Sequence, residues 1–297
     1  MVCQSNLRSC NFGFKLSPLP VPSLPHVDLD IRSPARIIYG MAPRLASAAI
    51  FVAFFALTGA LAAQQSQPLS IRGHPQTLRI YGARGRGDPV IVSSGDGGWI
   101  HLAPHVSEFL ASKGFFVVGF DSREYLESMT SGKSGVRVED EPADYRVLAE
   151  FASQGSRAKP ILIGVSEGAG LSVLAATDSG TRSMIGGVVG LGLPEMNELA
   201  WHWKDAVIYV THGAPKEPLF SAASIIARVS PLPLAVIHST HDEYVPVDEL
   251  NRVFAAAREP KQLWMVKASN HRFSDNLDEF DQRLLEALEW VKKNQSR

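Results

Sequence analysis

Residues 160–170 read PILIGVSEGAG, and they contain the most informative motif of this chain. The first half is a short apolar run, typical of a strand that is buried on both faces. The run leads into Gly-x-Ser-x-Gly, and residues 169–176 after it predict a helix. A strand that turns sharply into a helix at Ser166 would leave the serine hydroxyl exposed, as in a nucleophile elbow.

Steric crowding explains the two glycines of this motif. The tight turn brings its backbone close to the neighbouring strand and helix, so a side chain at Gly164 or Gly168 would collide with them. Ser166 would then stand at a helix N-terminus, where the positive end of the helix dipole favours negative charge. The alternative is a chance match in a glycine-rich turn, but the strand before it and the helix after it favour a catalytic serine.

Short apolar runs alternate with amphipathic segments on both sides of this motif. The predicted strands are residues 89–93, 115–121, 160–165, 185–191, 232–238 and 262–266, and the predicted helices are residues 103–113, 143–152, 169–176, 247–257 and 276–293. This alternation over one domain-sized segment predicts an α/β fold, with a mostly parallel central sheet and helices on both faces. Ligands of such sheets bind at the carboxyl ends of the strands.

One segment, residues 195–229, fits this alternation poorly. Trp201, His202 and Trp203 lie near its start, and Pro215 and Pro218 interrupt it. It is predicted to form either a lid over the site or one more strand, at residues 206–211, with a helix.

A catalytic serine needs a base to remove its proton and a third group to orient that base. In α/β-hydrolases these residues follow the chain order serine, acid, histidine. Asp242 lies in the loop after the strand at 232–238, and His271 lies in the loop after the strand at 262–266. Because each follows the end of its own strand, both can meet Ser166 at one edge of the sheet. The candidate nucleophile, acid and base are therefore Ser166, Asp242 and His271.

Other polar residues near these loops have weaker positions for the same roles. Glu243 adjoins Asp242 and could replace it, or it could be a solvated loop charge. His238 and His241 precede the last strand, so we expect them to line the pocket or hold the loop rather than act as the base.

His101 and His105 have a spacing that can bind a metal on a helix. No carboxylate lies in register with them, however, and Pro104 favours a helix start there. We therefore expect neither a metal nor a cofactor.

Acyl transfer also requires N–H donors for the developing oxyanion, and the loss of one costs about 3–4 kcal/mol. The backbone N–H of Glu167, next to the nucleophile, is the first expected donor. The second is expected from Gly97 or Gly98, because glycine lets the backbone approach a substrate closely. The alternative is that the loop of Gly97 and Gly98 is a tight turn with no role in catalysis.

The loop at residues 93–99 (SSGDGGW), Leu102, and the stretch at residues 119–125 (GFDSREY) resemble the AcvB/VirJ branch of the α/β-hydrolases, which are exported, virulence-associated bacterial proteins. That branch has a similar S-G-D-G-G-W loop, a later G-x-D-S-x-x-Y stretch and a G-x-S-x-G elbow. The resemblance covers residues 90–176, with weaker support from the loops of Asp242 and His271. It implies an α/β-hydrolase fold and, for some members, cleavage of aminoacyl esters on membrane phospholipid.

The elbow departs from this branch at two positions. Glu167 stands where an aromatic residue is usual, and Gly170 stands where aspartate is usual. The substrate could therefore differ. Glu167 could attract a cationic group at the pocket mouth, or it could face solvent.

The N-terminal residues predict export. Arg44, an apolar run at residues 45–61 and the small residues at 60–63 are the three parts of a signal peptide spanning residues 41–63. A retained membrane anchor is the alternative, since a spanning helix needs roughly 17–25 residues. Residues 1–40 are proline-rich without an apolar period, which predicts a disordered extension, unless Met41 is the true start. Residues 64–297 then form the hydrolase domain, in the periplasm or secreted.

Composition excludes several other functions. Cys3 and Cys10 both precede residue 64, so the predicted mature part has no disulfide, thiolate metal site or cysteine nucleophile. The formal net charge is −1, and no clustered basic face suggests a nucleic-acid partner. The expected partners are a small-molecule or lipid ester and a membrane surface.

The leading functional hypothesis is a serine hydrolase that cleaves a carboxylic ester through an acyl-enzyme on Ser166. A peptidase or amidase is the nearest alternative, because the triad does not distinguish leaving groups. A non-catalytic periplasmic adaptor that keeps the hydrolase fold is the alternative from another class.

Overall fold

The computed structural model describes residues 64–132, 134–202 and 218–295. The expected extension and signal peptide, residues 1–63, lie outside these ranges. Within them, no helix combines the length and the apolar character that crossing a membrane would require.

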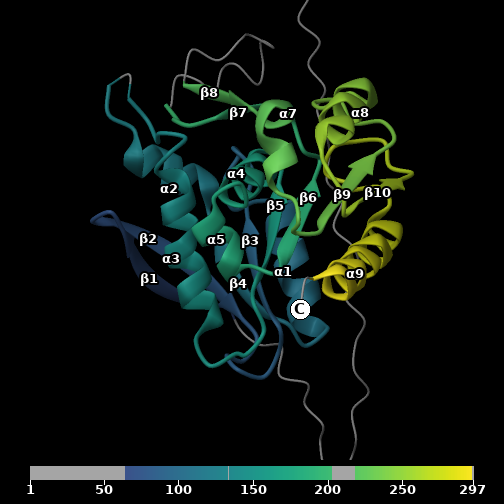
Figure 1. The fold of residues 1–297 in the computed structure, drawn as a ribbon. Helices are drawn as coiled ribbons and strands as arrows, with labels where there is room; N and C mark the ends of the chain where they lie inside the picture. Colours follow the sequence, from purple (N-terminus) through teal and green to yellow (C-terminus); the bar gives the residue numbers. More distant parts are fainter. Residues whose placement is uncertain (1–63, 133, 203–217, 296–297) are drawn as a thin grey trace, which may run out of the picture. The chain divides into compact units, whose positions relative to one another are not determined.

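An eight-stranded sheet forms the centre of the described chain (Figure 1), in the order β1-β2-β4-β3-β5-β6-β9-β10. The first two strands form an antiparallel hairpin, and β2 is antiparallel to β4. All other neighbours are parallel, which confirms the predicted mostly parallel sheet. The strands are β1 (Gln65–Ile71), β2 (His74–Tyr81), β3 (Pro89–Ser93), β4 (Phe116–Phe120), β5 (Ile161–Val165), β6 (Gly187–Leu191), β9 (Leu234–Ser239) and β10 (Lys261–Val266).

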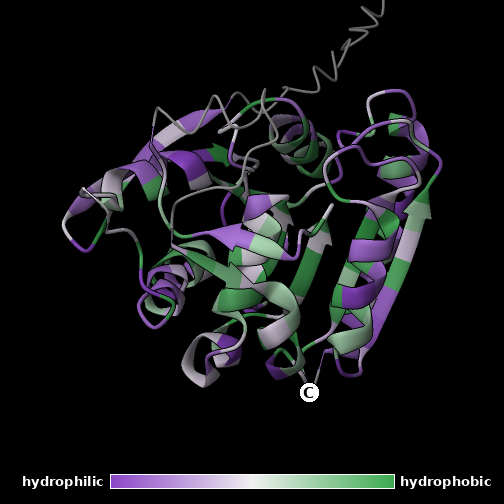
Figure 2. Ribbon diagram, turned by 90° about the horizontal axis from the view of Figure 1, so that it is seen from above, coloured by the Kyte–Doolittle hydropathy of each residue, from purple (hydrophilic) through white to green (hydrophobic). Residues whose placement is uncertain are grey.

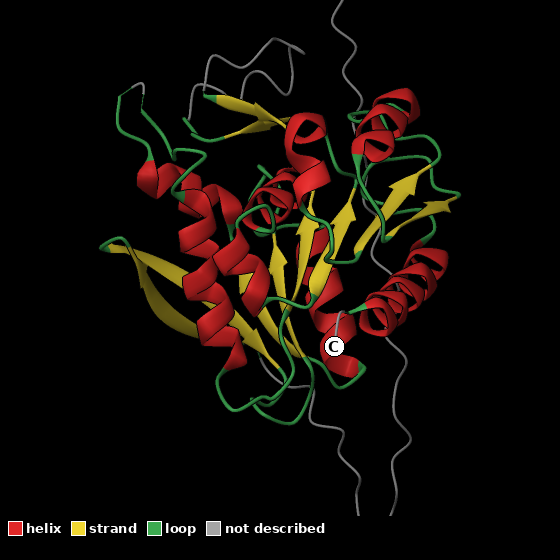
Figure 3. Cartoon of the chain, in the orientation of Figure 1, coloured by secondary structure: helices red, strands yellow, loops and turns green. Residues whose placement is uncertain are grey.

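Helices cover both faces of this sheet (Figure 3), as the sequence predicts. On one face lie α1 (Leu102–Ser112) and α9 (Leu277–Asn294), and on the other lie α3 (Glu141–Ser153) and α4 (Glu167–Ala175). The remaining described α-helices are α2 (Ser122–Met129), α5 (Ser179–Met184), α7 (Ala222–Ile225) and α8 (Val247–Ala256).

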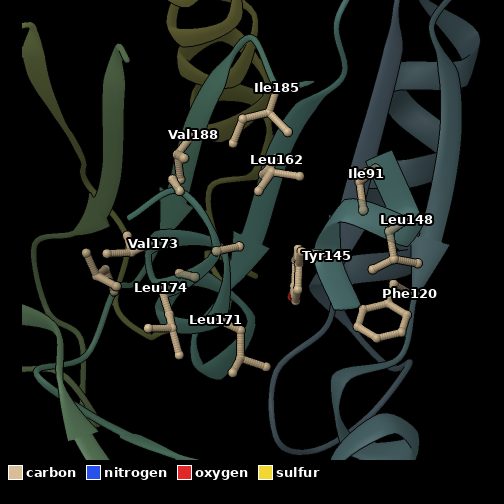
Figure 4. Close-up of a cluster of buried hydrophobic side chains, with 14 of the residues drawn as sticks. Ile91, Phe120, Tyr145, Leu148, Leu162, Leu171, Val173, Leu174, Ile185 and Val188 are labelled. Atoms are coloured by element: carbon tan, nitrogen blue, oxygen red, sulfur yellow. The ribbon is translucent and has the colours of Figure 1, made fainter. Parts of the chain in front are cut away.

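The core has two layers because successive residues of a strand point to opposite faces of the sheet. Ile91 of β3 packs in the same cluster as Tyr145 and Leu148 of α3 (Figure 4). Its neighbours Val90 and Val92 belong to the cluster on the other face, with α1 and α9. Both faces of the central strands are therefore apolar (Figure 2), which explains their nearly continuous apolar runs in the sequence.

Outside the segment 195–229, the sequence-based prediction lacks the β1–β2 hairpin, α2 and α5. Most residues of β1 are at least partly exposed, so it lacks a buried apolar pattern. The two helices are short and polar, and each begins at an aspartate cap. Asp121 accepts the N–H of Glu124, and Asp178 accepts that of Thr181. Such caps satisfy N–H groups that the first helical turn leaves unpaired.

A small two-stranded sheet lies beyond the carboxyl ends of the central parallel strands (Figure 1). It pairs β7 (Met196–Glu198) with β8 (Leu219–Ser221) in antiparallel orientation. Both strands lie in the segment 195–229, which does not follow the alternation of strands and helices in the sequence. The strand expected at residues 206–211 lies outside the described residues.

Candidate active site

Ser166 lies in the turn between β5 and α4, with a backbone φ of 51°. A left-handed φ is uncommon for a residue other than glycine, and it persists where the surrounding structure holds it. The N–H of Ser166 donates to the carbonyl of Leu191 on β6 at 2.8 Å, and its own carbonyl accepts the N–H of Ala169 at 2.8 Å. These bonds hold the serine at the carboxyl edge of the sheet, in the sharp turn that the motif predicts.

The glycines on either side of Ser166 fill the steric role that their spacing suggests. A Cβ atom at Gly164 would lie 2.1 Å from the carbonyl oxygen of Gly168. A Cβ atom at Gly168 would lie 2.4 Å from the carbonyl oxygen of Ser94. The obstructing atoms are backbone, so neither clash could be relieved by a side-chain rotation.

Asp242 and His271 meet at the same edge of the sheet, each in the loop after its own strand. The Nδ1 atom of His271 lies 2.6 Å from Oδ2 of Asp242. The other carboxylate oxygen accepts the N–H groups of Tyr244 and Val245 at 3.0 and 2.8 Å. Burial opposes ionisation of Asp242, but its hydrogen bonds from His271 and the backbone outweigh that effect and lower its pKa. The carboxylate is therefore charged, and it orients the imidazole with Nδ1 as the donor.

The imidazole of His271 lies against Gly192, the residue after β6. A Cβ atom at Gly192 would come within 2.5 Å of the ring atom Cε1. The preceding residue, Leu191, accepts the N–H of Ser166, so the ring and the serine approach the same end of β6. Both also line one cavity. The other ring nitrogen, Nε2, is buried and has no hydrogen-bond partner among the described residues.

The loop at residues 94–99, the oxyanion loop, lies beside the elbow. A Cβ atom at Gly95 would be 3.3 Å from Cβ of Ser166. Within the loop, the N–H of Gly98 donates to the carbonyl of Gly95 at 3.0 Å and closes a turn. Of the two glycines expected to supply a donor, Gly97 is thus the one whose N–H stays free of acceptors in the described ranges.

Asp96 is a second donor candidate in the same turn, and sequence reasoning missed it. Its N–H and that of Gly97 have no acceptor among the described residues, because the turn hydrogen bond uses only the outer residues of a β-turn. The N–H of Glu167, at the start of α4, is likewise unpaired within the described part of the chain, as expected for a first helical turn.

A cavity of about 370 Å³ opens beside Ser166. Ile100, Met196 and Tyr244, whose side chains are large, apolar and about half exposed, all line it. Met196 lies in β7, and β8 contributes Leu219, so the segment 195–229 borders the cavity. The other lining residues are Gly95, Asp96, Gly97, Gly98, His101, Leu102, Val165, Glu167, Pro194, Glu198, Val245, His271 and Arg272.

Two glutamates near Ser166, Asp242 and His271 have roles that the sequence did not suggest. The carboxylate of Glu167 is buried and accepts the N–H of Glu198 in β7 at 2.8 Å. Burial raises its pKa well above the usual range. It therefore neither faces solvent nor stands free at the mouth. Glu243 accepts the backbone N–H of His271 at 2.6 Å, so it holds the loop of His271 and does not take the place of Asp242 beside the imidazole.

The four other histidines considered as site residues lie in four different environments. His238 is fully buried, and its Nε2 lies 3.0 Å from the carbonyl of Val245, so it braces the loop of Asp242. Burial lowers its pKa. His105 bonds Asp281 of α9 at 2.8 Å, and the ring of His241 contacts Thr240 at the surface. His101 lines the cavity.

Comparison with known proteins identifies relatives that match most of the described chain. A family model described as bacterial virulence protein (VirJ) matches residues 88–289. The uncharacterized protein YfhR of Escherichia coli O157:H7 is 24% identical over 188 residues, which are 63% of this chain and 64% of that protein. The chain thus matches slightly less than two thirds of the length of this relative.

Solved structures show the fold. The esterase Pf2001 of Pyrococcus furiosus superposes with a TM-score of 0.56 at 18% identity, covering 77% of this chain and 90% of the esterase. A membrane phospholipase A described as a novel bacterial virulence factor superposes with a TM-score of 0.56 at 11% identity, covering 78% and 88% of the two chains. The described chain has the α/β-hydrolase fold, as the sequence predicts.

Proposed function

The chain belongs to the VirJ family of bacterial virulence proteins, and we propose that it is a serine hydrolase that cleaves a carboxylic ester through an acyl-enzyme on Ser166. The observation that carries this proposal is the pairing of Asp242 with His271 at 2.6 Å beside the cavity that Ser166 lines. A carboxylate that accepts a hydrogen bond from Nδ1 selects, in the neutral imidazole, the tautomer whose Nε2 can accept a proton.

In the proposed reaction, Nε2 of His271 removes the hydroxyl proton of Ser166 while Oγ attacks the ester carbonyl carbon. The oxyanion that forms accepts N–H groups from Glu167 and from the oxyanion loop. Collapse of this intermediate breaks the ester bond, and His271 returns the proton to the departing alcohol. Water then attacks the acyl-enzyme with His271 again as base, which releases the acid and restores Ser166.

The lining of the cavity supports a substrate with a sizeable apolar part. Ile100, Met196 and Tyr244 are large apolar side chains exposed at the cavity, and such side chains clustered at a site are typical of binding surfaces. We therefore favour an acyl or aminoacyl ester of a lipid over a small polar ester. Contact with a membrane surface is part of this proposal.

Export is also part of the proposal, with residues 41–63 as a cleaved signal peptide. N-terminal sequencing of protein recovered from the periplasm or medium would test it. A first residue near Gln64 supports cleavage, whereas a chain that retains residues 41–63 supports a membrane anchor.

Labelling with a fluorophosphonate probe tests the nucleophile. Wild-type protein should be labelled, Ser166→Ala should not, and a variant of an exposed serine on α1, Ser112→Ala, should be labelled like wild type. Labelling that persists in Ser166→Ala would contradict the assignment.

Turnover of p-nitrophenyl esters tests the activity. Hydrolysis should disappear in Ser166→Ala and in His271→Ala. The same geometry would serve an amidase, so p-nitroanilides with the same acyl groups should be compared, and faster anilide cleavage would favour a peptidase or amidase. Absence of labelling and of turnover in the wild-type protein would favour the non-catalytic adaptor.

A further inference from the structure

Two motifs that are separate in the sequence meet beside the cavity. The first is the oxyanion loop, residues 94–99, which follows β3. The second is the stretch of residues 119–125 at the end of β4 and the start of α2. The strands β3 and β4 are parallel neighbours, so their carboxyl ends bring the two motifs together. The mechanism proposed above uses only the first.

The side chain of Asp121 joins the two motifs. Its Oδ2 atom accepts the backbone N–H of Trp99 at 3.0 Å, and its Oδ1 atom lies 3.3 Å from the hydroxyl of Ser94, which it shares as a donor with the carbonyl of Gly95 at 3.2 Å. These two residues are the ends of the oxyanion loop. The hydroxyl oxygen of Ser94 also accepts the N–H of Ser122 at 3.0 Å. One buried carboxylate therefore holds both ends of the loop.

Packing around Trp99 restrains the loop further. The indole lies against Gly119 of β4, where a Cβ atom would come within 2.3 Å of Cη2. The guanidinium of Arg79, on β2, stacks over the indole at 5.0 Å from the ring centroid and also contacts Oδ2 of Asp121 at 3.4 Å. Because Gly119 has no side chain, the indole of Trp99 can pack directly against β4.

The held loop is the one that reaches the nucleophile. Its turn, closed by the bond from Gly98 to Gly95, places Gly95 so near Ser166 that a Cβ atom at Gly95 would lie 3.3 Å from Cβ of the serine. The free N–H groups of Asp96 and Gly97 lie in that turn. A hydrogen-bond donor stabilises an oxyanion only if it is held where the charge develops, without a cost of reorganisation. The restraints on Ser94 and Trp99 supply that rigidity.

We propose that Asp121 is a positioning residue for catalysis: it clamps the oxyanion loop at Ser94 and Trp99 and so keeps the loop's N–H groups beside Ser166. This rests on the proposed hydrolase function. It also explains why the two motifs occur together, because Gly119 receives Trp99 while Asp121 binds the N–H of that same residue.

The test compares Asp121→Ala and Asp121→Asn with wild type on a p-nitrophenyl ester. In Asp121→Ala, kcat should fall by about 10- to 100-fold, approaching the loss of an oxyanion donor, with little change in KM. In Asp121→Asn the loss should be smaller, because the amide oxygen still accepts one N–H. Inhibition by an aryl boronic acid, which forms a tetrahedral adduct on serine, should weaken in parallel with kcat. The pH dependence of kcat/KM should keep its midpoint, since Asp242 and His271 are untouched.

Asp178→Ala is the matched control. Asp178 caps α5 through the N–H of Thr181 as Asp121 caps α2 through that of Glu124, but its side chain bonds Arg146 and Thr181 and no residue of the oxyanion loop. This variant should lose stability without losing kcat. An equal loss of kcat in Asp178→Ala and Asp121→Ala, or wild-type kcat in Asp121→Ala, would overturn the proposal.

A milder variant decides the matter if Asp121→Ala does not fold. Ser94→Ala removes the hydroxyl that contacts Asp121 and accepts the N–H of Ser122 but leaves the bond from Trp99 to Asp121, and kcat should fall by about 2- to 10-fold. Wild-type kcat and boronic acid affinity in folded Ser94→Ala and Asp121→Asn would contradict the clamp. Activity that survives in Ser166→Ala would instead contradict the hydrolase mechanism, so the two failures are distinguishable.

Discussion

Replacing Gly192 with alanine should disable the proposed base, His271, without altering Ser166, Asp242 or His271 itself. Gly192 has a φ of 60°, and a Cβ atom at this position would point at the imidazole of His271. A Cβ atom there would lie 2.5 Å from Cε1, 3.0 Å from Nδ1 and 3.3 Å from Nε2. Ordinary contacts of a Cβ atom begin at 3.4 Å, so the ring has to withdraw from all three positions.

The size of the effect follows from these distances. To restore ordinary contact, the ring must move by about 1 Å, and a misplacement of that size costs on the order of 100-fold in rate. The bond of 2.6 Å from Nδ1 to Asp242 limits the direction in which the ring can move. Alanine in the left-handed region also costs about 1–2 kcal/mol of stability, but that cost does not by itself lower the activity of folded protein.

Gly73→Ala separates the two contributions. Gly73 has a φ of 84°, and a Cβ atom there would have no heavy atom within 4 Å, so alanine adds backbone strain without a clash. We expect kcat/KM for a p-nitrophenyl ester to fall by about 100-fold in Gly192→Ala and to stay at the wild-type value in Gly73→Ala, with both melting temperatures lowered. If Gly192→Ala retained the kcat/KM of Gly73→Ala, the inferred position of the imidazole would be wrong.

Three further substitutions test other contacts. Asp242→Asn should lower kcat by about 10⁴-fold. The amide oxygen would keep the N–H groups of Tyr244 and Val245, so the NH₂ group would donate to Nδ1 and fix the wrong tautomer. Circular dichroism would verify that the variant is folded, and near-wild-type kcat would exclude Asp242 as the acid. Glu243→Gln weakens the hydrogen bond of 2.6 Å that the carboxylate accepts from the backbone N–H of His271. The kcat/KM should therefore fall by about 10-fold. An unchanged kcat/KM would show that this bond does not orient His271. Glu141 is fully buried, and neither of its carboxyl oxygens has a hydrogen-bond partner among the described residues. Burial raises the pKa of this carboxyl group well above the ordinary value of 4.5, and the nearby charge of Asp144 raises it further. Above about pH 4.5 the unfolded chain releases this proton, whereas the folded protein keeps it. The free energy of unfolding therefore falls as the pH rises. In Glu141→Gln the decrease in melting temperature from about pH 5 to about pH 8 should be shallower than in wild type, and an identical decrease would show that Glu141 does not contribute to it.

Much of the fold could be predicted because the central strands are buried on both faces. Burial leaves a nearly continuous apolar run, such as residues 161–165. In the helices between the strands, apolar residues recur with the helical period of about 3.6 residues. The β1–β2 hairpin could not be found in this way, since most of β1 is exposed and lacks that pattern. The helices α2 and α5 depend on caps at Asp121 and Asp178, which are a weaker signal than hydrophobic periodicity.

The roles of individual side chains were harder to predict than the elements that carry them. Glu167 could be placed next to the nucleophile, but its bond to the N–H of Glu198 depends on where β7 lies. The choice between Gly97 and Gly98 as a donor depends on the turn that Gly98 closes with Gly95. Both outcomes are set by the backbone conformation of loops, for which residue type alone is a poor guide.

From the order of residues alone one can obtain the elbow at Ser166, the parallel sheet around it, and the loops in which Asp242 and His271 lie. Each of these depends on local features: the period of apolar residues, the glycines of a turn, and the rule that loops follow strands at one edge. Only the tertiary structure decided that His271 rests on Gly192, that Glu243 holds the loop of the base, and that Asp121 binds both ends of the oxyanion loop. These contacts join strands that are distant in the chain, so they arise from sheet order and packing, which no local pattern encodes.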